Sequence, residues 1–110
     1  MMKMGIENTK KILILGLEKA FSMRDDETGE IIVGRRMHYA VPNMEKGSSG
    51  LMAVSACFMR ERVRLLDSVT TCGYYEASLE WVEKTDKKGK IVATSRFTGF
   101  RLLKEFKPEF

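Results

Sequence analysis

Histidine and cysteine are scarce in this sequence, and their scarcity excludes most metal and disulfide chemistry. The chain has one histidine, His38, and two cysteines, Cys57 and Cys72, which are not closely spaced. A zinc site of the usual pattern needs four such ligands arranged in close pairs. We therefore expect no metal and no cofactor. We also expect both cysteines to be reduced thiols, as is usual in a cytoplasmic protein.

Long hydrophobic runs are also missing. The apolar run from Ile12 to Leu17 is far shorter than the roughly 20 residues that a membrane-spanning helix needs, and Glu18 and Lys19 follow it directly. No small-residue cleavage site follows this run, so we do not expect an export signal. The sequence therefore predicts a protein without a membrane partner.

The motifs of common enzymes are absent as well. No serine lies in a nucleophile-elbow motif, and the single histidine has no evident catalytic partner. Segment 44–50 is rich in glycine and serine, but Leu51 follows its last glycine where a phosphate-binding loop has lysine. The acidic segment 25–30 lacks the spacing of an EF-hand calcium loop. We therefore expect a binding protein. A small-ligand barrel or an enzyme stays as an alternative that would require a deep polar pocket.

The sequence is rich in strand patterns, and the clearest is a hairpin from Gly73 to Phe106. In its first half Tyr75, Ala77, Leu79 and Trp81 alternate with polar residues, which is the period of a strand with one buried face. Segment 85–90 has the aspartate, glycine and lysines of an exposed turn, and the second half is rich in β-branched and aromatic residues. Two strands bury too little to be stable alone, so the rest of the chain is expected to complete the sheet.

Three further segments complete the predicted fold. We expect strands at 10–21, 31–41 and 51–63, the first bent at Gly16 and the second interrupted at Gly34. The 110 residues then form a single all-β domain, in which residues 1–9 and 107–110 are loose termini. Five strands broken by glycines predict a small barrel or a curled sheet with extended β-hairpins.

Cations lie beside aromatic side chains on the predicted strands, a combination that binds single-stranded nucleic acids. On strand 31–41, Arg35 and Arg36 precede His38 and Tyr39, and we expect the Tyr39 ring to be exposed for stacking. Arg60, Arg62 and Arg64 alternate, so on a strand they would form a basic row on one face, or else a charged strand end in solvent.

The remaining predicted contacts lie in the closing hairpin. Lys88 is one of several lysines around its turn, and Arg96 and Arg101 flank Phe97 and Phe100 on the last strand. We expect Phe97, Phe100 and Trp81 to belong to the core. The net charge of +4 permits an anionic partner without requiring one.

Two parts of the chain resemble the single-stranded DNA-binding proteins of filamentous phages, which have small OB-like barrels. Residues 22–39, with Gly34-Arg35-Arg36-Met37-His38-Tyr39, are similar to the DNA-binding wing of that family, and residues 73–103 are similar to its closing hairpin. The resemblance implies a five-stranded OB-like barrel and a homodimer that coats single-stranded DNA during phage or plasmid-type rolling-circle replication. It further implies that Arg24, Arg35, Arg36 and Tyr39 are wing contacts and that Arg101 is the basic position of the last strand.

A second reading of the same sequence is a protein-interaction module or a phage structural subunit without nucleic-acid binding. Such a module would bind its partner through an exposed edge strand. The sequence leaves this choice open, and it also leaves open whether a nucleic-acid partner would be DNA or RNA.

Overall fold

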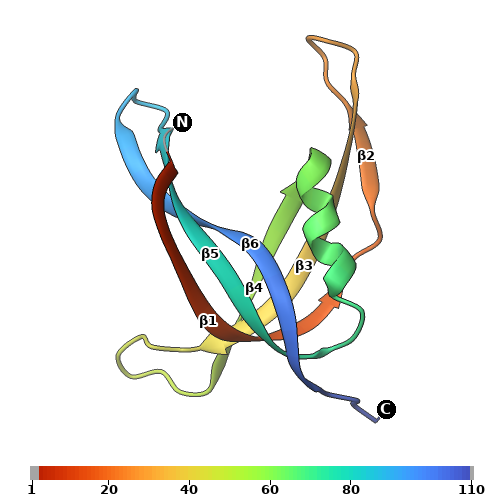
Figure 1. The fold of residues 1–110 in the computed structure, drawn as a ribbon, viewed down its shortest axis with the longest axis vertical. Coiled ribbons are helices and arrows are strands. Elements are labelled where there is room, and N and C mark those ends of the chain that lie inside the picture. Colours follow the sequence, from red (N-terminus) through yellow and green to blue (C-terminus); the bar gives the residue numbers. More distant parts are fainter. Residues whose placement is uncertain (1–2, 110) are drawn as a thin grey trace.

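The computed structural model describes residues 3–109, with side chains from Asn8 onward, as an antiparallel sheet and one short helix. The strands and the 3-10 helix η1 follow one another as β1 (Lys3–Leu17), β2 (Phe21–Arg24), β3 (Ile31–Pro42), β4 (Leu51–Met59), η1 (Arg60–Ser68), β5 (Gly73–Thr85) and β6 (Ile91–Glu105). The β2–β3 hairpin extends well beyond the rest of the sheet, whereas β1 accompanies the β5–β6 hairpin almost to its turn (Figure 1). Over residues 3–109 the all-β prediction is therefore confirmed, with six strands where five were expected.

The sheet curls but does not close. Its order is β4-β3-β1-β5-β6, and β2 pairs with the first residues of β3, beyond the stretch of β3 that pairs with β1. The predicted bend at Gly16 is confirmed as a break in register between Ile14 and Gly16. In residues 3–109 no ladder joins the outer strands β4 and β6, so the predicted closed barrel is not confirmed.

The helix η1 lies between the two outer strands, packing against β6, β3 and β4 (Figure 1). Arg62 of η1 donates a hydrogen bond from Nη2 to the backbone carbonyl of Phe97 on β6. The Arg62 guanidinium thus donates to a backbone carbonyl oxygen at the edge of β6, which would otherwise accept from a neighbouring strand. We call the region between β4 and β6 the seam.

The predicted third strand, 51–63, was too long. β4 ends at Met59, Arg60 adopts a positive φ of 58°, and residues 60–68 wind into η1. A 3-10 helix has three residues per turn, so side chains three apart share a face. Glu61, Arg64 and Asp67 are accordingly exposed, and Leu66 is buried. Arg60, Arg62 and Arg64 therefore do not form the expected basic row.

The core lies on the concave side of the sheet. Ile12 and Ile14 of β1, Met37 of β3, Phe58 of β4 and Tyr75 of β5 are almost completely buried. Phe97 and Phe100 of β6 are also buried, as predicted, with ring centroids 5.2 Å apart. Trp81 was expected in the core, but 39% of it is exposed. The β5–β6 register shifts between Ser78 and Leu79, and beyond that shift Glu80 and Val82 are the buried residues of β5.

The prediction for the N-terminal end of the chain was wrong. Residues 1–9 were expected to be loose, but β1 begins at Lys3 and pairs along β5, with Asn8 opposite Leu79. The pairing extends β1 because β5 is itself long. At the other end, β6 stops at Glu105 and residues 106–109 have no regular structure. Within the described range, no helix is long and apolar enough to cross a membrane.

Candidate nucleic-acid interface

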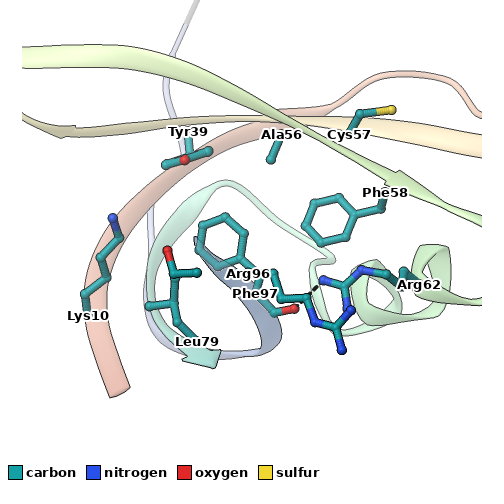
Figure 2. Close-up of a pocket in the computed structure, with 10 residues that line it drawn as sticks. Lys10, Tyr39, Ala56, Cys57, Phe58, Arg62, Leu79, Arg96 and Phe97 are labelled. Atoms are coloured by element: carbon teal, nitrogen blue, oxygen red, sulfur yellow. Dashed lines mark hydrogen bonds between the residues drawn. The ribbon is translucent and has the colours of Figure 1, made fainter. Parts of the chain in front are cut away.

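A cleft of about 340 Å³ opens at the seam, between β4 and β6. Its walls come from six elements, namely β1, β3, β4, η1, β5 and β6. The lining residues are Lys10, Tyr39, Ala56, Cys57, Phe58, Arg62, Leu79, Ser95, Arg96 and Phe97 (Figure 2). The cleft exists because the sheet does not close here, so side chains of both outer strands remain accessible from one opening. We call it the seam cleft.

Aromatic rings form the interior of the seam cleft. The Tyr39 and Phe97 rings meet edge to face with centroids 5.5 Å apart, and the Phe58 and Phe97 rings stack at 6.2 Å. Only 9% of Tyr39 is exposed, so it is not the freely accessible stacking platform that we expected. The alternation of β3 turns Tyr39 to the same side as Met37, toward the core. The Tyr39 ring therefore forms part of the wall of the seam cleft.

Burial changes the chemistry of Tyr39. Desolvation raises the pKa of its phenol above the ordinary value, because the charged phenolate is disfavoured away from water. Like an ordinary phenol, the hydroxyl group is protonated at neutral pH, and burial extends this state to more alkaline solution. In that form it can donate a hydrogen bond as well as accept one.

Three cations line the seam cleft. Lys10 comes from β1, Arg62 from η1 and Arg96 from β6. The ion pairs between residues whose side chains the structure describes do not include Lys10. Arg96 is held by Glu80, with its Nε and its Nη2 each 2.7 Å from Oε1 of that carboxylate.

The electrostatic state of Arg62 favours an incoming anion. Burial, and then the nearby charge of Arg96, lower the pKa of Arg62. Both effects mean that the charged guanidinium is less well stabilised here than in water. Glu80 and Glu61 act in the opposite direction but are weaker contributors. A phosphate group in the seam cleft would offset this cost directly.

The other predicted site residues do not join the seam cleft. Several are already bound to carboxylates or carbonyls: Arg60 to Glu30 at 3.1 Å, Arg101 to Glu76 at 3.2 Å, His38 to Glu18 at 2.5 Å, and Arg35 to the backbone oxygen of Glu18 at 2.7 Å. Arg24, Arg36 and Lys88 are exposed on β2, β3 and the β5–β6 turn. The structure therefore brings together Tyr39, Arg62 and Arg96 from the predicted set.

A second groove lies on the opposite side of η1, between this helix and β3. It has a volume of about 610 Å³, and its charged lining residues are Arg60, Arg64, Glu30 and Glu61. Two cations are thus balanced by two carboxylates, and Arg60 is paired with Glu30. Among the residues whose side chains the structure describes, three cations and no carboxylate line the seam cleft, and only Arg96 of the three is paired, with Glu80. The seam cleft is therefore the better candidate for an anionic partner.

Sequence reasoning missed Lys10 and Phe58. Both follow from alternation: Lys10 shares a strand face with Ile12 and Ile14, and Phe58 shares one with Ala56. Lys10 was missed because residues before it were expected to be loose. Phe58 was missed because no charge adjoins it in sequence.

Comparisons with protein-family models, with curated proteins and with solved structures found no match for this chain. The function must therefore be argued from the geometry of the described residues.

Proposed function

We propose that this protein binds single-stranded nucleic acid, without strong sequence preference and without catalysis, through the seam cleft. The observation that carries the proposal is the convergence of Lys10, Arg62 and Arg96 around the rings of Tyr39, Phe58 and Phe97. Cations that contact phosphates and aromatic surfaces that contact bases are the two requirements of such binding. The coating of DNA in phage or plasmid-type replication is a further part of the proposal and comes from the family resemblance alone.

The arrangement of strands supports the same proposal. With β2 set aside, the chain order is three strands, a helix and two strands, and the first strand lies at the centre of the sheet. We infer an OB-like barrel that is open between its third and fifth strands, β4 and β6. Nucleic acids bind OB folds over the second and third strands, which here are β3 and β4. Tyr39, Ala56 and Phe58 of the seam cleft come from these two strands.

In the proposed complex the phosphates contact the cations and a base enters between them. Lys10 supplies a mobile point charge, and Arg62 has further N–H groups besides the one bound to Phe97. The volume of the seam cleft is at the lower end of the range for small-ligand sites, so it suits one or two bases rather than a duplex. Every base has a flat apolar face, so this mode of binding tolerates sequence.

Salt dependence tests the proposal. Binding of a fluorescent oligothymidine, measured by anisotropy at several salt concentrations, should weaken as salt rises because phosphate neutralisation releases counterions. Lys10→Ala should lower the slope of log K against log salt by about 0.7 and weaken binding to different sequences equally.

Arg101→Ala is the matched control for Lys10→Ala. It removes one positive charge from the sheet, but Arg101 is paired with Glu76 and does not line the seam cleft. The control should bind nearly as well as the unaltered protein. Equal losses in the two variants would mean that only net charge matters, and undetectable binding at low salt would exclude the function itself.

A further inference from the structure

The two ends of the seam cleft differ. β4 leads directly into η1, and η1 packs against β6, so the chain crosses the seam where β4 ends. The hydrogen bond from Arg62 to the Phe97 carbonyl holds this crossing in place. Figure 2 shows Arg62 at this end of the cleft and Lys10 at the other, with the Phe97 ring between them. We call these the η1 end and the Lys10 end. A nucleic-acid strand that enters beside Lys10 has no straight path past η1.

Two guanidinium groups converge at the η1 end. Burial, and then the charge of Arg96, lower the pKa of Arg62, so the two groups lie within electrostatic reach of each other. Arg96 is bound to Glu80 through Nε and Nη2, and Arg62 is bound to the Phe97 carbonyl through Nη2. The Nη1 group of each side chain takes no part in these bonds. The η1 end therefore offers N–H donors from two side chains to one anion.

The charge of a phosphate decides how well it suits the η1 end. A phosphodiester within a strand carries a single negative charge, whereas a terminal phosphate carries about −1.5 to −2 at neutral pH and has three oxygen acceptors. Guanidinium groups bind phosphate oxygens through paired N–H donors. Two guanidinium groups can thus share the three oxygens, and the additional negative charge offsets the repulsion between Arg62 and Arg96.

We propose that the seam cleft binds the phosphorylated end of a nucleic-acid strand in preference to its interior. The terminal phosphate contacts Arg62 and Arg96 at the η1 end, the terminal base lies against the aromatic rings, and the next phosphate contacts Lys10. The cleft volume of about 340 Å³ is of the size that one such nucleotide needs. This inference rests on the proposed function, because it names the form of nucleic acid that the cleft binds most tightly.

Matched oligonucleotides test the proposal on the unaltered protein. One oligothymidine, fluorescently labelled at the opposite end, is made with a terminal hydroxyl, a terminal phosphate or a methyl-capped terminal phosphate, at the 5′ end and separately at the 3′ end. In anisotropy measurements at low salt, the phosphate form should bind ~10-fold more tightly than the hydroxyl form at one end or at both, because a further charge-assisted hydrogen bond contributes about this factor. The methyl cap adds little bulk but removes one charge, so the capped form should lose most of the gain.

Variants at the two ends of the cleft provide the matched comparison. Arg62→Gln removes the charge at the η1 end and keeps an amide donor, so it should bind the three forms with similar affinity. Lys10→Ala should weaken binding of all three forms by a similar factor and keep the preference for the phosphate form, since Lys10 lies at the other end. Urea unfolding checks that both variants are folded. If Arg62→Gln does not fold, the three forms compared on the unaltered protein decide the question alone.

Competition distinguishes a strand end from a free nucleotide or a free phosphate. Thymidine 5′-monophosphate should displace the phosphate-ended strand at lower concentration than thymidine or inorganic phosphate does, because only the nucleotide joins a phosphate to a base. The strand should itself bind more tightly than the free nucleotide, because it has the next phosphate for Lys10. Inorganic phosphate as effective as the nucleotide, or a free nucleotide that binds more tightly than the strand, would overturn the proposal.

The failure of this inference can be told apart from the failure of the proposed function. Measurable but equal binding of the three forms overturns the preference for a phosphorylated end and leaves single-strand binding in place. A preference that a folded Arg62→Gln variant retains also overturns the inference, because the terminal phosphate then lies elsewhere. No binding of any form at low salt overturns both.

Discussion

At the scale of single residues, burial decides what the aromatic side chains can do. Tyr39 was expected to be an exposed ring, but it contacts Phe97 and is almost buried. Tyr75 is fully buried and still satisfies its hydroxyl group, which donates to the backbone oxygen of Thr71 at 2.7 Å. Each of these two side chains therefore packs through its ring and has one polar atom, the hydroxyl oxygen.

Burial of Tyr39 predicts a loss of stability in alkaline solution. The raised pKa means that the folded protein holds the phenol proton more tightly than the unfolded chain does. This contribution to stability is complete below pH about 10 and falls as the pH rises through the folded pKa. In urea unfolding measured from pH 7 upward, Tyr39→Phe should lose stability less steeply than the unaltered protein. Tyr74→Phe, which removes an exposed phenol, is the control, and identical curves for Tyr39→Phe and the unaltered protein would contradict the prediction.

At the scale of elements, the β5–β6 hairpin is the best specified part of the chain. Its alternating pattern and its turn were identified from sequence, and β5 pairs along its whole length with β6. The hairpin is also constrained by one close backbone approach. A Cβ atom at Gly73 would lie 2.4 Å from the backbone oxygen of Lys104, whereas nothing lies within 4 Å of the corresponding position at Gly99.

This difference predicts opposite outcomes for two alanine substitutions in one hairpin. Gly73→Ala should lower the free energy of unfolding by ~1–3 kcal/mol, because the backbone of β6 has to move. Gly99→Ala should change it by ~0.5 kcal/mol or less. Chemical denaturation of the two variants measures both values. A Gly73→Ala variant as stable as Gly99→Ala would mean that the two strands separate there at little cost.

At the scale of the whole molecule, η1 takes the place that a ladder between β4 and β6 would have in a closed barrel. It contributes Leu66, which is 2% exposed, to the main core and Arg62 to the edge of β6. The seam cleft exists beside it for the same reason. The site and the incomplete closure of the sheet therefore have one cause.

Removal of the buried side chain of η1 should consequently weaken the whole fold. Leu66→Ala is expected to lower the free energy of unfolding by ~2–5 kcal/mol through lost burial and a cavity. Arg64→Ala, on the exposed face of the same helix, should change it by no more than ~0.5 kcal/mol. Thermal and urea unfolding check both variants, and equal costs would show that η1 is not part of the cooperative core.

The sequence alone located most of the strand segments and the turns, because alternation with a period of two reflects which face each strand buries, and this pattern is local. It did not give β2 as a separate strand, the start of β1 or the end of β4. The exposed residues Glu61, Arg64 and Asp67 of η1 do recur at intervals of three. A strand was nevertheless predicted there, because the apolar residues of 51–66 do not keep helical spacing.

Only the tertiary structure decided that the sheet stays open, that Lys10, Arg62 and Arg96 meet at one cleft, and that His38, Arg60 and Arg101 are bound to carboxylates instead. These facts depend on contacts between residues far apart in the chain. Such contacts are set by the curl of the sheet and by the docking of η1, and no short stretch of sequence encodes either.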